Sequence, residues 1–231
     1  MELKIKSGYF SGFEKILWLV SLSSIIIFFC IFDRRGWLAL TASLVGMHSL
    51  LLNAKGHPLG QALAVIFSVL YGIISFRSRY YGEMITYLCM TMPMAVFSLV
   101  SWLKNPFEEG KAEVAVNRLR RREILFMFCL ATAVTVAFYF ILNALNTANL
   151  IPSTLSITTS FLASYLTFRR SPYYAVAYAF NDIVLVILWT MMTIKNITYL
   201  SVTICFIVFL ILDIYGFFCW RRMEINQTKS N

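Results

Sequence analysis

The chain has 231 residues, of which 59% are hydrophobic and only 13% are charged, and its mean hydropathy is +0.73. A soluble domain carries about a quarter charged residues, so this composition excludes an ordinary soluble protein and indicates a polytopic membrane protein. The net charge of +9 comes from basic residues in short stretches between apolar runs, which is how membrane proteins set their orientation, so we expect no nucleic-acid partner.

Eight apolar runs follow one another along the chain. About 20 apolar residues at ~1.5 Å each cross the hydrocarbon core of a bilayer, and each run approaches this length. Continuous runs of this size favour helices over a barrel, whose strands alternate over segments of ~10 residues. We therefore expect one all-α membrane domain over residues 1–231 with eight transmembrane helices. The predicted spans are Ile16–Phe32, Trp37–Asn53, Leu59–Phe76, Tyr81–Leu103, Ile124–Leu145, Ile151–Phe168, Pro172–Met192 and Tyr199–Trp220.

The first span has the position of a signal peptide but not its cleavage site. It is followed by Asp33-Arg34-Arg35 rather than by small residues, so we expect a retained helix. With eight spans, 15 of the 20 Lys and Arg residues fall on the side that holds both termini. This asymmetry predicts that both termini are cytoplasmic in the plasma membrane.

The longest connection, residues 104–123, lies on the predicted cytoplasmic side. It carries a basic cluster over Arg118–Arg122 at the entrance to the fifth span. We interpret this cluster as an anchor that fixes topology, with a lipid-headgroup or regulator site as the alternative.

Two blocks of three spans resemble each other, one over residues 37–103 and the other over residues 151–220. In each block the first connection is short, basic and ends in a proline, Pro58 or Pro172. Each block closes with a tryptophan followed by basic residues, at Trp102 and Trp220. Because three is an odd number, the span over 124–145 must return the chain so that both blocks enter from the same side. We predict a parallel 3+1+3 repeat like that of the SWEET transporters, with residues 16–32 as an extra helix.

The seventh span holds the main candidate site. An ionisable carboxyl at mid-membrane costs roughly 2.5–3.5 kcal/mol and is rarely kept without a use, which makes Asp182, beside Asn181, a candidate functional residue. Steps of three and four along a helix place on one face Tyr174, Tyr178, Asn181 and Asp182. A tyrosine ring stacks on a planar heterocycle, an amide offers a donor and an acceptor, and a carboxylate accepts hydroxyl hydrogens, so this face suits a nucleoside-like ligand.

Other polar and aromatic residues complete the candidate set. They are Trp189 and Asp213 in the last two spans, and His48, Asn53, Gln61, Tyr71, Glu83 and Tyr87 in spans two to four. His48 is the one candidate ion-pair partner for Asp182. Glu83 has the alternative role of capping the fourth span, and Asp213 that of a hydrogen-bonding group between helices. The aromatic residues have the alternative role of helix packing or interfacial belts.

The sequence offers few residues for enzymatic catalysis or for metal binding. All five cysteines fall inside apolar runs without a C-x-x-C pair, and only two histidines exist. The motifs G-x-S-x-G, H-E-x-x-H, G-x-G-x-x-G and the P-loop are missing. We therefore expect a protein that is not an enzyme, holds no metal or cofactor and does not use ATP by itself.

Four short motifs, in order, give the chain its resemblance to a known family. They are Tyr71-Gly72, Tyr80–Met84 followed by Pro93-Met94, Asn181–Val184, and Asp213–Gly216 before Trp220. With this spacing over residues 36–220, the chain resembles the PnuC family of vitamin and nucleoside transporters. The resemblance implies a SWEET-like homotrimer with an extra N-terminal helix. It also implies facilitated diffusion of nicotinamide riboside, trapped by a cytoplasmic kinase for NAD synthesis.

The chain departs from the family at one motif. Members that carry nicotinamide riboside commonly have a W-x-x-W pair early in the helix that holds Asn181. Here Tyr174 stands at the first position and Ala177 at the second, with Tyr178 beside it. The substrate therefore stays open among nicotinamide riboside, deoxynucleosides, thiamine and riboflavin, and a non-transporting scaffold or sensor is the alternative of a different class.

Our leading hypothesis assigns the ring of nicotinamide riboside to Tyr174, Tyr178 and Trp189. Asn181 and Asp182 would bind its amide or ribose. Aligning Pro58 with Pro172 puts Phe67 opposite Asn181 and Ser68 opposite Asp182, so the polar half of the site is expected from the second block.

Overall fold

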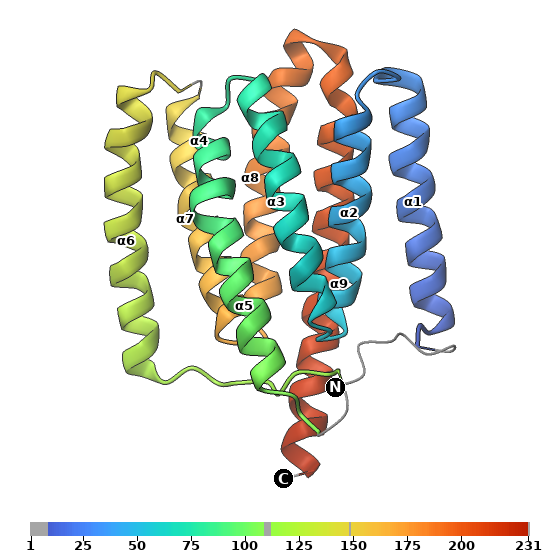
Figure 1. The fold of residues 1–231 in the computed structure, drawn as a ribbon, viewed down its shortest axis with the longest axis vertical. Coiled ribbons are helices and arrows are strands. Elements are labelled where there is room, and N and C mark those ends of the chain that lie inside the picture. The colour runs from blue at the N-terminus through green and yellow to red at the C-terminus, as the bar shows by residue number, and fades with distance from the viewer. Residues whose placement is uncertain (1–8, 109–111, 148, 231) are drawn as a thin grey trace.

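The computed structural model describes residues 9–108, 112–147 and 149–230, and these are helical apart from short connections and one isolated β-bridge between Pro106 and Val114. The helices stand side by side as a bundle with α1 and α6 at opposite edges (Figure 1). The helices are α1 Gly12–Phe32, α2 Trp37–Ala54, α3 Leu59–Arg77, α4 Tyr81–Ile85, α5 Met92–Lys104, α6 Arg121–Ala144, α7 Leu150–Phe168, α8 Tyr174–Lys195 and α9 Leu200–Ser230.

Among the residues that the structure describes, seven helical stretches are long and apolar enough to cross a membrane. They correspond to seven of the eight predicted spans and make the chain a multi-pass membrane protein. The remaining predicted span is α7, which has the length of a span but lower hydropathy, because eight of its 19 residues are Ser or Thr. It packs between α6 and α8, and its hydroxyls are largely buried there.

Two helices differ from their predicted form. The fourth span is interrupted by a π-helix over Thr86–Thr91, between α4 and α5. A π-turn widens the helix and often accompanies a functional site. The last helix continues ten residues beyond Trp220 to Ser230. The start of α1 and the end of α9 lie at the same end of the bundle (Figure 1).

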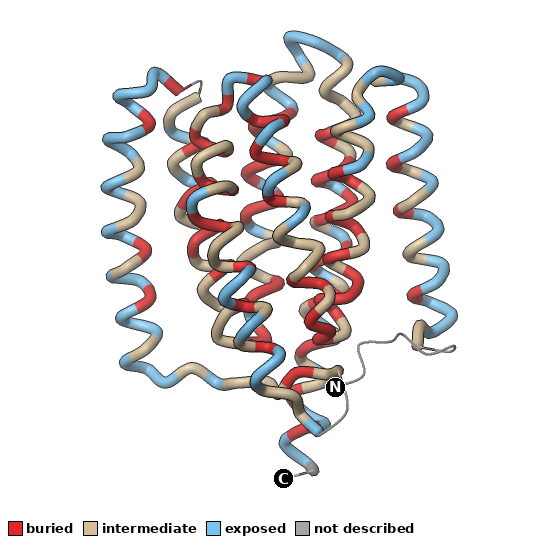
Figure 2. Tube along the Cα trace, viewed as in Figure 1, coloured by how far each residue is buried: buried red, intermediate tan, exposed pale blue. Residues whose placement is uncertain are grey.

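The core lies among α2, α3, α8 and α9. Buried residues follow the inner faces of these helices, whereas α1 and α6 are mostly exposed on the outside (Figure 2). In α6 only Met127, Ala131 and Leu142 are buried, mainly against α7. Apolar outer faces of this kind suit contact with lipid chains.

The turns from α2 to α3 and from α7 to α8 have the same backbone geometry. The residue two positions before proline has positive φ in each, 63° at Gly56 and 57° at Arg170. The next amide donates to the carbonyl five residues earlier, at 3.0 Å in the first turn and 2.9 Å in the second. This is the Schellman ending of a helix, for which glycine is the favoured residue.

We expect Arg170→Gly to raise the free energy of unfolding by about 1 kcal/mol, because glycine removes the strain of a left-handed arginine. Gly56→Ala is the matched control and should lower stability by at least about 1 kcal/mol, since its Cβ would lie 2.7 Å from Met223 Cε. Thermal unfolding in detergent measures both. A lower melting temperature for Arg170→Gly would show that its side chain stabilises the turn.

Two tryptophans join the two blocks reciprocally. Trp102, at the end of α5, donates its indole N–H to the Thr167 carbonyl at the end of α7, at 3.0 Å. Trp220 donates in the same way to the Asn53 carbonyl at the end of α2, at 2.7 Å. The two indole rings lie 5.3 Å apart between centroids. The last helix of each block is thus bonded to the first helix of the other.

A strap of extended chain, residues 112–120, crosses this end of the bundle. Val114 N donates to the Gly56 carbonyl at 3.1 Å, and Asn117 N donates to the Arg170 carbonyl at 3.0 Å. Gln227 on α9 also holds the strap, since its side chain donates to the Val114 carbonyl at 3.1 Å. The strap therefore binds the two equivalent turns, and we call this end of the bundle the strap end.

Candidate functional site

Asn181 on α8 points toward α7. Its Oδ1 accepts hydrogen bonds from Ser160 and Thr159 at 2.9 Å each, and from Ser156 at 3.5 Å. Asn181 is 1% exposed, and Tyr87 of the π-helix contacts its side chain. Because the protein itself fills the amide oxygen, Asn181 can offer a ligand only its amide hydrogens.

The hydroxyls of α7 were not among the site residues predicted from the sequence. The signal was present, because serine recurs every four residues at 156, 160 and 164, which places a polar stripe on one face of an apolar helix. Two of these serines bond Asn181, and the third lies 3.4 Å from the hydroxyl of Tyr178. The stripe therefore orients the polar residues of α8.

Asp182 points the other way, toward α9, where its carboxyl contacts that of Asp213. The two residues are 4% and 3% exposed. Two carboxyl groups can hydrogen bond only when one of them carries a proton. Asp182 Oδ2 accepts no hydrogen bond from an amide, hydroxyl or amine within the described residues, and buried acceptors are rarely left so without a reason. This oxygen can accept a hydroxyl of a ligand.

His48 does not pair with Asp182, contrary to the hypothesis from the sequence. It accepts the indole hydrogen of Trp18 at 3.1 Å, and its other ring nitrogen contacts the Leu44 carbonyl at 2.7 Å. These bonds tie α1 to α2. His48 therefore belongs to the packing of the extra helix.

Glu83 lies in the first turn of α4 and is fully buried. The capping role is not realised, because no side-chain bond caps α4 and neither carboxyl oxygen has a well-formed hydrogen bond among the described residues. The hydroxyl of Ser156 on α7 lies next to it. Glu83 thus places a buried carboxyl near the α7 face that holds Asn181, on the side opposite to Asp182 and Asp213.

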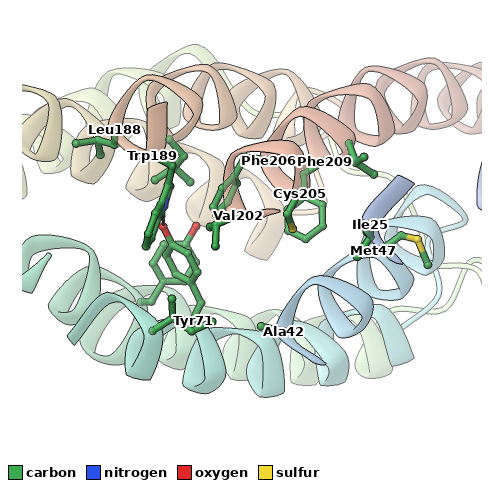
Figure 3. Close-up of a cluster of buried hydrophobic side chains, with 14 of the residues drawn as sticks. Ile25, Ala42, Met47, Tyr71, Leu188, Trp189, Val202, Cys205, Phe206 and Phe209 are labelled. Atoms are coloured by element: carbon green, nitrogen blue, oxygen red, sulfur yellow. Dashed lines mark hydrogen bonds between the residues drawn. The ribbon is translucent and has the colours of Figure 1, made fainter. Parts of the chain in front are cut away.

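An aromatic cluster lies beside these polar residues. Tyr71 and Tyr87 are 4.4 Å apart between ring centroids, and Phe67 lies within 6 Å of both. From α9, Phe206 packs on Tyr71 at 5.3 Å and Phe209 on Phe67 at 5.5 Å. Figure 3 shows Tyr71 on one side and Phe206 and Phe209 on the other. Tyr87 also contacts Asn181, so the aromatic cluster lies directly beside the polar residues of α8.

Trp189 and Tyr174 lie too far apart to bind one ring. They are 15 residues apart on α8, which is about 22 Å at 1.5 Å per residue. Trp189 donates to the Tyr71 hydroxyl at 2.6 Å, whereas Tyr174 packs on Trp220 at 4.9 Å at the strap end. Of the three predicted ring contacts, Tyr178 is the one within a helical turn of Asn181 and Asp182.

Gln61 lies apart from the other candidates. It donates to Asn53 Oδ1 at 2.9 Å, in a buried network that includes Ser49. Gln61 is two residues inside α3, about 9 Å along the helix from Phe67. The structure thus brings together five of the eight predicted site residues, namely Tyr87, Tyr178, Asn181, Asp182 and Asp213, and places Gln61, Tyr174 and Trp189 toward the ends of the bundle.

We expect loss of the Tyr71 hydroxyl, in Tyr71→Phe, to lower the free energy of unfolding by about 1–2 kcal/mol, because the buried Trp189 N–H loses its acceptor. Trp189→Phe removes that donor, so the double variant should be destabilised by less than the sum of the single variants. Unfolding of all four proteins in the same detergent gives the coupling. Strict additivity would show that this bond contributes nothing.

Comparison with known proteins agrees with this architecture. The model of the family described as nicotinamide mononucleotide transporter matches residues 36–222. This chain belongs to that family. The family consists of transporters, which confirms the expectation that the protein is not an enzyme and the resemblance to the PnuC family.

Two relatives and one solved structure resemble the transporter along nearly its whole length. The nicotinamide riboside transporter PnuC of Neisseria mucosa is 23% identical over 220 residues, which cover 94% of this chain and 83% of the relative. The protein of the same name from Haemophilus influenzae is 20% identical over 226 residues, which cover 96% of this chain and 97% of the relative. A crystal structure of the vitamin B3 transporter PnuC superposes with a TM-score of 0.83 at 22% identity, covering 94% of both chains, and supports the fold.

Proposed function

We propose that this transporter carries nicotinamide riboside across the plasma membrane by facilitated diffusion. One observation carries the proposal. The carboxyl of Asp182 and the amide of Asn181 lie next to the aromatic cluster around Tyr71 and Tyr87, midway along the bundle. Both relatives are named as nicotinamide riboside transporters, which supports the same substrate class here.

The chemistry of the substrate fits these groups. Nicotinamide riboside has a flat, positively charged pyridinium ring, a carboxamide and a ribose. A cationic ring gains from aromatic faces and from a nearby carboxylate, which Tyr71, Tyr87 and Asp182 would supply. The amide hydrogens of Asn181 would donate to the carboxamide oxygen, and Asp182 Oδ2 would accept a ribose hydroxyl. Tyr178 would contact the ring or the sugar from the strap end.

Both ends of this site are closed by aromatic contacts. The bond between Trp189 and Tyr71 closes one end, and the packing of Tyr174, Trp102 and Trp220 closes the strap end. We infer that these contacts act as alternating gates, since each joins a helix of one block to a helix of the other. This assignment moves Tyr174 and Trp189 from ring contacts to gating positions.

We further propose eight transmembrane helices in a 3+1+3 repeat, with α7 as the eighth crossing and α1 as the extra helix. The shared turn geometry and the reciprocal tryptophan bonds support the repeat. The polar face of α7 is buried against α8, which makes its low hydropathy tolerable in a membrane. The distribution of Lys and Arg supports a cytoplasmic strap end with both termini.

Facilitated diffusion alone only equalises concentrations, so we propose that a cytoplasmic kinase traps the substrate as a phosphate ester for NAD synthesis. A homotrimer is the proposed assembly, which light scattering in detergent would test. In proteoliposomes without a kinase, labelled nicotinamide riboside should reach equal concentrations inside and outside. Accumulation above equality would contradict facilitated diffusion.

Uptake in cells that lack other routes tests the substrate. The full chain is expressed, and labelled nicotinamide riboside, thiamine, riboflavin and deoxynucleosides are followed in parallel. Uptake of nicotinamide riboside supports the proposal. Uptake of one of the other compounds alone would replace the substrate and keep the transport function, whereas uptake of none, with the protein at the cell surface, would favour a scaffold or sensor.

A further inference from the structure

A crevice of about 550 Å³ opens at the strap end, away from the central site. It lies where α6 begins, α7 ends and α8 begins, with the strap and α9 along one side. These helix ends mark the boundary of the apolar spans, so the crevice lies at the level of the lipid headgroups. Its interior is apolar, with Leu119, Ile124, Met127, Leu166 and Pro172.

The rim of the crevice is cationic. Arg118 on the strap contacts Glu224 through Nε at 2.6 Å, and its side chain is 69% exposed. Arg221 on α9 contacts the same carboxylate and lies 5.7 Å from the ring centroid of Tyr173. Glu224 is 5% exposed, so one buried carboxylate holds two guanidinium groups whose ends stay accessible. The rim keeps a net positive charge.

We propose that this crevice binds an anionic phospholipid, with the phosphate between Arg118 and Arg221 and an acyl chain on the apolar interior. Guanidinium groups match phosphate oxygens in charge and geometry. A free phosphate compound would gain nothing from the apolar residues, whereas a lipid uses both parts of the crevice. The inference stands apart from the proposed substrate, because none of these residues belongs to the central site.

Lipid binding would also act on the strap. Arg118 lies one residue from Asn117, whose backbone N–H binds the α7–α8 turn. A phosphate that holds Arg118 and Arg221 together would therefore strengthen the link between the strap and α9.

The test measures lipid binding to the delipidated full-length protein by native mass spectrometry in detergent. We expect phosphatidylglycerol to bind at least roughly tenfold more tightly than phosphatidylcholine, as one guanidinium–phosphate contact would give. Arg118→Gln and Arg221→Gln should each reduce this preference several-fold. The matched control is Arg222→Gln, an exposed neighbour that does not line the crevice and should keep the preference.

A second variant separates the crevice from general attraction to charge. Leu119→Trp fills the apolar interior, leaves every charge in place and should also weaken phosphatidylglycerol binding. Thermal unfolding without lipid checks that each variant is folded. Equal binding of the two lipids, an equal loss in Arg222→Gln, or displacement of the lipid by inorganic phosphate or a nucleotide at equal concentration would each overturn the proposal. Uptake assays are not needed, so failure here leaves the proposed function untouched.

Discussion

Asn181→Ala is expected to abolish uptake of nicotinamide riboside, a fall of at least roughly tenfold, while the amount of protein at the cell surface stays normal. The amide oxygen of Asn181 is filled by hydroxyls of α7, so its amide hydrogens are what the substrate would lose. Folding should suffer by only about 1 kcal/mol, because Thr159 also bonds the Leu155 carbonyl at 3.1 Å and keeps that partner. Labelled uptake and surface labelling measure the two effects separately.

Asn181→Asp sharpens this experiment. A carboxylate still accepts the hydroxyls of α7 but has no hydrogens to donate, so this variant should also lose uptake. Its stability should fall, because a buried carboxyl at this depth costs roughly 2.5–3.5 kcal/mol. Phe180→Ala is the matched control, because Phe180 is the preceding residue of α8, is 61% exposed and should tolerate the change. Unchanged transport in Asn181→Ala would mean that the binding site lies elsewhere in the bundle.

The helical class of the fold was predictable because hydropathy and charge act on whole segments. Seven predicted spans match helices within a few residues, apart from the extension of α9. The π-helix over Thr86–Thr91 was not visible in the sequence, since it depends on how α4 packs against its neighbours. The hydropathy of α7 was also ambiguous, because a polar stripe is tolerable only when another helix covers it.

The residue types of the candidate site were predictable from the sequence, but the directions of their side chains were not. Asn181 and Asp182 are adjacent, so their side chains diverge by about 100° around the helix, and only the packing shows that one meets α7 and the other α9. A shared helix face also says nothing of the position along the helix axis. Tyr174 and Trp189 therefore lie near opposite ends of α8. Asp213 stood far from Asp182 in the chain, and nothing in the spacing of the two predicted their contact.

That contact leads to the second prediction, in which one chemical change has opposite outcomes at two positions. Asp182→Asn should reduce uptake at least roughly tenfold, because the unpartnered oxygen then loses its negative charge. If the proton shared by the two carboxyls sits on Asp213, Asp213→Asn should keep uptake within about threefold, because the amide of the new asparagine then donates to Asp182 in place of that proton. Labelled uptake and substrate-induced thermal shifts measure both variants.

The two variants distinguish a residue that binds the substrate, Asp182, from a residue that only positions it, Asp213. If Asp213 holds the shared proton, Asp182 stays charged and faces a cationic substrate without a competing cation, since no Lys or Arg lies within the apolar core of the described spans. An equal loss in the two variants would assign both carboxyls to the substrate. Full activity in both would leave the contact as a structural bond between α8 and α9 and would move the recognition of the sugar to Glu83, the remaining buried carboxyl on the α7 side.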